Sequence, residues 1–125
     1  MFVSISRYRA RPGEDDAIVA LHEDWQRRVP AAAPGFLSSE LLRSAGDPQL
    51  FFDIVRFESE EAARAHSRDP EQRAWCRRLA SLSEVEPDTL DCSVAWWWTT
   101  PPNWDARIPR ERRMIDPHVT RRKSR

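Results

Sequence analysis

The pattern of apolar and polar residues predicts four strands, through two faces in the first segment and aromatic and β-branched residues in the third. The four segments are Phe2–Ala10, Phe36–Arg43, Leu50–Phe57 and Asp88–Trp98. In the first of them, Phe2, Ser4, Ser6 and Tyr8 share one side, while Val3 and Ile5 share the other. We therefore predict four strands, with the second and third joined by a hairpin across residues 44–48.

A different period separates these strands. Ile18, Leu21, His22, Trp25 and Val29 recur at helical spacing after an acidic turn, which predicts a first helix over residues 14–29.

Ser59 is placed as the N-cap of a second helix, which Asp69 and Pro70 interrupt. A further helical piece is expected over residues 71–82, with Trp75 and Leu79 on its inner face.

The order of these elements is β-α-β-β-α-β, the plan of a ferredoxin-like α+β fold. We expect residues 1–98 to form this domain and residues 99–125 to form an irregular C-terminal extension, because prolines interrupt it. Helices would cover one face of the sheet. The other face also carries apolar residues, so a second copy of the chain is its simplest cover, and we expect a homodimer.

Zero net charge hides an asymmetry between the two ends of the chain. Residues 1–106 carry 12 basic and 18 acidic side chains, whereas residues 107–125 carry 8 basic and 2 acidic ones. The basic end would be a flexible tail, or bind an acidic surface or a polyanion. Basic residues without interleaved aromatics do not predict nucleic-acid binding. The single lysine, Lys123, lies in this tail, which argues against Schiff-base chemistry.

No apolar run approaches the ~20 residues of a membrane span, and the N-terminal residues do not resemble a signal peptide, so a cytoplasmic location is expected. Cys76 and Cys92 are expected to be reduced and buried as small apolar residues. His22, His66 and His118 lack the spacing of metal ligands, and we expect no metal and no cofactor.

Several short motifs resemble those of the antibiotic biosynthesis monooxygenase family, whose members are small dimeric α/β-barrel proteins. They are Pro34-Gly35-Phe36-Leu37, Arg56-Phe57-Glu58-Ser59, Glu61-Ala62, Asp69-Pro70 and Ala74-Trp75. The resemblance covers about residues 1–98 and implies the fold more strongly than a reaction. The family includes cofactor-independent oxygenases that convert polycyclic phenols to quinones, haem-degrading enzymes and signal-processing proteins.

Two branches of that family can be compared with this chain. The haem-degrading branch uses an Asn, a Trp and a His where Ser6, Phe57 and Trp75 look equivalent here, so the resemblance argues against haem degradation. The quinone-forming branch carries an Asn and a Trp where this chain has Asp53 and Phe57, which is a partial match.

Asp53 is the first candidate catalytic residue, since it alternates with Phe51, Val55 and Phe57 on an aromatic face. A desolvated carboxylate there would accept a phenolic proton as a general base, or else pair with Arg56, Arg7 or the backbone. His22 would shuttle protons if it faces inward, or be a satisfied core histidine. His66, beside small residues, would face a ligand or solvent.

Aromatic side chains predict a slot for a flat substrate. The candidate substrate-binding residues are Trp25, Phe51, Phe57, Trp75 and Trp96. Each of them would otherwise be structural core. In the Trp96-Trp97-Trp98 run, strand alternation would place Trp97 on the opposite side from its neighbours, and we favour a dimer contact there over a substrate wall.

These residues support three hypotheses. The first is a small cofactor-independent monooxygenase of antibiotic biosynthesis, which acts on an aromatic polyketide-type phenol and O₂. The second is a polyketide cyclase on the same scaffold, and the third is a non-enzymatic binding or stress protein.

Overall fold

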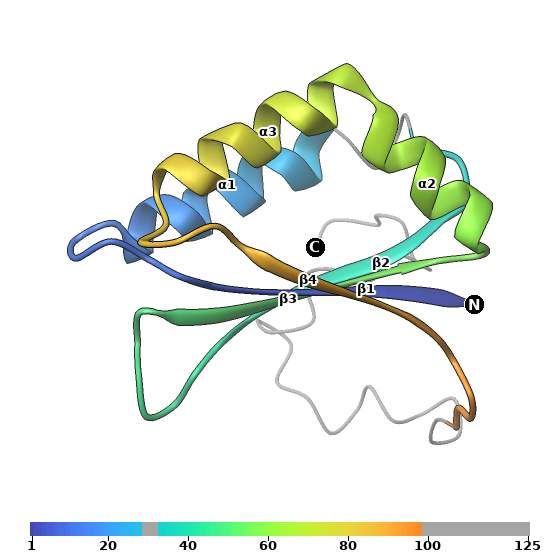
Figure 1. Cartoon of the computed structure of the whole chain (residues 1–125), viewed down its shortest axis with the longest axis horizontal. Coiled ribbons are helices and arrows are strands. Elements are labelled where there is room, and N and C mark those ends of the chain that lie inside the picture. Colours follow the sequence, from blue (N-terminus) through green and yellow to red (C-terminus); the bar gives the residue numbers. More distant parts are fainter. Residues whose placement is uncertain (29–32, 99–125) are drawn as a thin grey trace, which may run out of the picture. The chain divides into compact units, whose positions relative to one another are not determined.

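The computed structural model describes residues 1–28 and 33–98. Among these residues, three helices lie on one side of a four-stranded sheet (Figure 1). In chain order the elements are β1 (Phe2–Arg9), α1 (Asp15–Arg28), β2 (Phe36–Arg43), β3 (Leu50–Phe57), α2 (Glu60–Arg68), α3 (Pro70–Ser81) and β4 (Asp88–Ser93). The strands are ordered β2-β3-β1-β4, and every neighbouring pair is antiparallel. The predicted ferredoxin-like α+β class is therefore confirmed.

Two capping residues explain why the second helical segment is divided. Ser59 accepts a hydrogen bond from the amide of Ala62 and begins α2, as predicted. Asp69 accepts hydrogen bonds from the amides of Glu71 and Gln72, and Pro70 follows it in the first turn of α3. Because Asp69 both ends α2 and caps α3, the chain changes direction there without leaving these amides unpaired.

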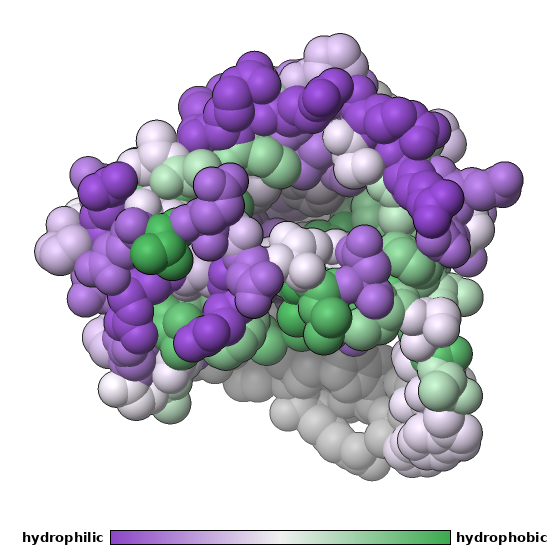
Figure 2. Space-filling view, viewed as in Figure 1, coloured by the Kyte–Doolittle hydropathy of each residue, from purple (hydrophilic) through white to green (hydrophobic). Residues whose placement is uncertain are grey.

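The register of β1 and β3 decides which side chains face the helices. Tyr8 lies opposite Phe51, and Ser6 lies opposite Asp53, so these four share the helix-covered face. On this face Tyr8, Phe51 and Ile18 of α1 are almost fully buried and form the core with Trp25, Trp75 and Leu79. The outer surface of the helices is largely hydrophilic (Figure 2). An ion pair between Arg28 of α1 and Glu71 of α3 joins these two helices.

The opposite face of the sheet keeps apolar side chains in contact with solvent. Ile5 lies opposite both Ile54 and Leu90. Leu42 and Leu90 are 44% and 64% exposed in the single chain. This is the face for which a second copy was expected, and the homodimer stays a prediction.

The fourth strand is shorter than predicted. β4 ends at Ser93, opposite Phe2, and the amide of Val94 makes the last bond, to the carbonyl of Met1. Because β1 gives no partner beyond that point, residues 94–98 are not a strand. The alternation expected for the tryptophan run is therefore wrong, and Trp96, Trp97 and Trp98 are 81%, 59% and 65% exposed.

The predicted burial of the cysteines is also wrong. Cys76 lies on the solvent side of α3 and is exposed, Cys92 is half-buried, and both are free thiols. No helix within the described ranges is long and apolar enough to cross a membrane.

The chain divides into two compact units, Met1–Val94 and Ala95–Arg125, and only residues 95–98 of the second are described. The expectations for Val29, for the 99–125 extension, for its basic charge and for His118 lie outside the described residues.

Candidate active site

Asp53 lies in the middle of β3, an inner strand of the sheet, and is 8% exposed beneath the helices. Neither predicted arginine partner reaches it, because Arg56 and Arg7 alternate onto the other face of the sheet. Arg56 instead pairs with Glu40 of β2 at 3.3 Å. The Oδ1 atom of Asp53 is buried and has no hydrogen-bond partner among the described residues. A buried carboxylate in this state is rare, and it calls for a functional explanation.

His22 faces inward from α1 and brings a second titratable group to this carboxylate. Its Nε2 atom lies 3.5 Å from Oδ2 of Asp53 and 2.8 Å from the hydroxyl of Tyr8. Its Nδ1 atom lies 2.9 Å from the carbonyl oxygen of Ile18, one turn earlier in the same helix. Both ring nitrogens therefore have polar neighbours, and the ring cannot rotate without losing them.

Tyr8 completes the cluster, and sequence reasoning did not select it. Burial raises the pKa of its phenol well above the ordinary value of 10, and the nearby charge of Asp53 raises this pKa further. The hydroxyl therefore keeps its proton over the whole range in which proteins are folded. The sequence did contain a signal for Tyr8, because Tyr8 shares its strand face with Ser6, the residue that pairs with Asp53. We call Tyr8, His22 and Asp53 the acid–base cluster.

Aromatic rings enclose the acid–base cluster. The edge of Trp75 meets the ring of His22 at 4.9 Å between centroids, and the indole N–H of Trp75 donates to the carbonyl of Leu21. Phe51 stacks on Tyr8 at 6.1 Å. Three predicted wall residues, Trp25, Phe51 and Trp75, thus belong to one buried group with Tyr8. Apolar walls of this kind weaken solvation and strengthen local electrostatic interactions.

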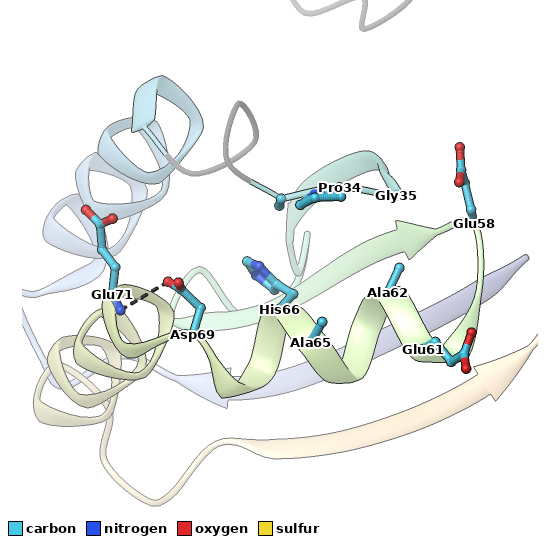
Figure 3. A pocket seen from close by; sticks show the side chains of 10 residues that line it. Pro34, Gly35, Glu58, Glu61, Ala62, Ala65, His66, Asp69 and Glu71 are labelled. Carbon is cyan, nitrogen blue, oxygen red and sulfur yellow. Dashed lines mark hydrogen bonds between the residues drawn. The ribbon is translucent and has the colours of Figure 1, made fainter.

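His66 lies in a separate cleft of about 440 Å³, between α2 and the turn that precedes β2. From α2, His66 and Ala62 point toward Pro34 and Gly35 (Figure 3). The complete lining is Ala33, Pro34, Gly35, Glu58, Glu61, Ala62, Ala65, His66, Asp69 and Glu71. Asp53 and His22 are not part of it, so the three predicted catalytic residues fall into two groups.

The environment of His66 disfavours the charged form of its ring. Burial lowers the pKa of His66 below 6.5, while the charge of Asp69 and the side chain of Gln72 act in the opposite direction. The ring contacts Phe57 at 5.4 Å and Trp25 at 5.8 Å between centroids. Trp25 in turn lies 6.3 Å from Trp75, so a line of aromatic rings joins the cleft to the acid–base cluster.

Two further observations concern the last predicted wall residue and metal binding. Trp96, the remaining predicted wall residue, belongs to the second compact unit. Across residues 1–28 and 33–98, no group of three or more His, Cys, Asp or Glu side chains could hold a metal ion.

A helix-covered antiparallel sheet with buried acid–base groups defines a ferredoxin-like α+β protein with an enclosed polar site. The family model for "Antibiotic biosynthesis monooxygenase" matches residues 1–78, and the chain belongs to this family. The resemblance that the motifs between Pro34 and Trp75 indicated is thereby confirmed. No curated protein matches this sequence.

Solved structures share the fold at low sequence identity. Rv0793 from Mycobacterium tuberculosis is 19% identical over 78% of this chain and 98% of its own, with a TM-score of 0.68. A conserved protein from Methanosarcina mazei Go1 is 10% identical over 73% of this chain and 89% of its own, with a TM-score of 0.67. A variant of SnoaB from Streptomyces nogalater, a cofactor-independent oxygenase, is 19% identical over 81% of this chain and 96% of its own, with a TM-score of 0.61.

Proposed function

We propose that this protein is a monooxygenase that uses no metal or flavin and oxidises an electron-rich aromatic phenol of the polyketide type in antibiotic biosynthesis. The family supports an oxygenase, and SnoaB is a cofactor-independent example on the same fold. The observation that carries the proposal is Asp53, a buried carboxylate whose Oδ1 atom has no partner among the described residues. A base of this kind gains by accepting a substrate proton, because protonation removes a poorly solvated charge.

The reaction balances without an added reductant if the substrate carries an activated methylene, as an anthrone-type phenol does. Asp53 takes one proton from that carbon and leaves a stabilised anion. The anion passes one electron to O₂, and the resulting radical and superoxide join through a new C–O bond. The peroxide recovers the proton from Asp53 and then breaks its O–O bond. As the O–O bond breaks, the second proton leaves the same carbon and departs with the hydroxide as water. A carbonyl group remains, and Asp53 is ready for the next cycle.

The aromatic residues around both sites suit a flat substrate. Trp25 lies against Trp75 on one side and His66 on the other, and of these three only His66 lines the cleft, so its ring is the first that an entering substrate would meet. We assign Trp25, Phe51, Phe57 and Trp75 to its binding, and His66 to the cleft through which it approaches.

We also propose that the protein works as a homodimer joined through the uncovered face of the sheet. Ile5, Ile54, Leu42 and Leu90 supply its apolar side chains, two of which are largely exposed in the single chain. Burial of such a face is the usual reason for a two-fold pair.

The test is oxygen consumption by the purified protein with a series of anthrone-type phenols. Asp53→Asn should lower kcat by about 10²- to 10⁴-fold, since that is the usual contribution of a general base. Asp16→Asn is a matched control, because Asp16 is an exposed carboxylate in the first turn of α1. Product mass should rise by one oxygen atom and fall by two hydrogens. Absence of oxygen uptake with every phenol tried would contradict the proposal.

Two other outcomes identify the alternatives. Turnover that continues without oxygen, with loss of water alone, would indicate a polyketide cyclase that uses the same acid–base cluster. The near-complete burial of Tyr8 and Phe51 specifically favours the other candidate, a non-enzymatic binding protein whose interior is filled. Such a protein would bind a phenol in the cleft of His66 and convert none of it.

A further inference from the structure

The acid–base cluster contains a hydroxyl that the reaction above does not use. Tyr8 is 1% exposed, and its phenolic oxygen lies 2.8 Å from His22 Nε2. A plain core position at this point would be filled equally well by phenylalanine. Among the described residues, the hydroxyl has one hydrogen-bond partner, His22.

The proton positions follow from the partners of the ring. A carbonyl oxygen can only accept, so the contact between Nδ1 and Ile18 requires a proton on Nδ1. In a neutral imidazole the other nitrogen then carries a lone pair. Tyr8 keeps its proton, because burial and the charge of Asp53 raise its pKa. Its hydroxyl is thus the donor, and Nε2 is the acceptor.

This arrangement determines whether Asp53 has a partner. Oδ2 lies 3.5 Å from the same Nε2 atom, close enough for an ion pair if the ring gained a second proton. Protonation at Nε2 would take from the Tyr8 hydroxyl the only acceptor that the described residues offer it. A buried donor without an acceptor is unfavourable, so the hydrogen bond between Tyr8 and His22 competes with an ion pair between His22 and Asp53.

We propose that Tyr8 is a positioning residue: the Ile18 carbonyl fixes the proton on Nδ1 of His22, and the Tyr8 hydroxyl occupies Nε2, which leaves Asp53 an unpaired base. This inference rests on the proposed function only for the role of Asp53 as base. The state of His22 is a property of the free protein. The groups that face His22 are Tyr8 from β1, Asp53 from β3 and Trp75 from α3, and the thiol of Cys76 on α3 is near enough to interact with Tyr8 and Asp53. No ion pair among the described residues joins Asp53 to an arginine.

The first test needs no substrate. Nitrogen-15 NMR of the histidine-labelled full chain near neutral pH should show His22 with a protonated Nδ1 and an unprotonated Nε2. In Tyr8→Phe, which removes only the hydroxyl, Nε2 should gain a proton and pair with Asp53. A protonated Nε2 in the unaltered protein would overturn the proposal, and this measurement stands even if the variant does not fold. An unprotonated Nε2 in a folded Tyr8→Phe protein would overturn it as well.

The second test uses kinetics and a matched control. Tyr8→Phe should lower kcat by about 10- to 100-fold, a part of what a general base supplies, with KM changed by less than about twofold. Ser83→Ala also deletes one buried hydroxyl, which donates to the carbonyl of Leu79 at 2.8 Å, away from the cluster. It should lower stability and leave both kcat and the His22 signals unchanged. Equal losses of kcat in the two variants would overturn the positioning role.

The two proposals fail separately. The expected NMR signals without any oxygen uptake would contradict the proposed oxygenase activity and support the tautomer assignment. Oxygen uptake that is lost in Asp53→Asn but kept in Tyr8→Phe would contradict the positioning role of Tyr8 alone.

Discussion

The acid–base cluster and the cleft each place a histidine against aromatic rings, but the polar partners of the two histidines differ. His22 has a partner at each ring nitrogen, supplied by Tyr8 and by Ile18. His66 lies at the edge of an open volume of about 440 Å³, with Phe57 and Trp25 as its ring neighbours. A fixed tautomer suits a group that tunes a neighbouring base, whereas a neutral ring beside free volume suits contact with a ligand.

Trp75 lies between the two regions and outside the lining of the cleft, so its structural role can be tested by substitution. This residue is 4% exposed, and it contacts His22 directly and His66 through Trp25. Trp75→Ala should lower the free energy of unfolding by about 3–5 kcal/mol, because it opens a cavity in the core. Urea denaturation measures this change.

Trp96→Ala is the control for the loss of an indole ring. Trp96 is 81% exposed, so its removal should change the free energy of unfolding by no more than about 0.5 kcal/mol. Similar losses in the two variants would contradict the description of Trp75 as a core residue.

The cleft depends on a close approach of two backbones, which Gly35 permits. Its φ is +84°, and a Cβ atom added there would lie 2.6 Å from the Cβ of Ala62. Gly35→Ala should therefore combine left-handed strain of about 1–2 kcal/mol with a clash that α2 must move to relieve. We expect a total loss of about 2–3 kcal/mol in urea denaturation.

Gly13→Ala separates these two contributions. Gly13 has the same φ of +84°, but an added Cβ meets nothing within 4 Å. This variant should lose only the conformational part, about 1–2 kcal/mol. If both alanine variants lose the same amount, contact between the turn and α2 does not shape the cleft.

Local patterns were enough to predict most of the fold. The bounds of β2 and β3 are those that were predicted, because the two strands pair from Phe36 to Arg43 with a single irregularity at Leu37. Ser59 caps α2 as expected, since capping needs only the three residues that follow it. The overlong prediction for β4 has the opposite cause. Its end depends on where β1 begins, about 90 residues earlier in the chain.

The candidate site was predictable only in part. Alternation placed Asp53 on the aromatic face, and helical spacing placed His22 on the inner side of α1. Whether His22 meets Asp53 depends on the rotation of α1 over the sheet, which no local pattern encodes. The role of Tyr8 follows only from that rotation, and so it was missed. The cleft of His66 likewise needs the tertiary approach of Gly35 to Ala62.

The smallest expected effect separates the two histidines by pH. The pKa of His66 is below 6.5 in the folded protein, so the unfolded chain binds more protons than the folded one in the interval below that value. The stability linked to His66 is therefore complete above pH 6.5 and is lost as the pH falls through the interval.

In urea denaturation between about pH 7.5 and pH 5.5, His66→Gln should lose less stability on acidification than the unaltered protein. Arg68→Gln, an exposed change on the same helix without an ionisation in this range, should follow the unaltered protein. If His66→Gln also follows it, the imidazole of His66 is not desolvated, and the two regions do not differ in the way that the structure indicates.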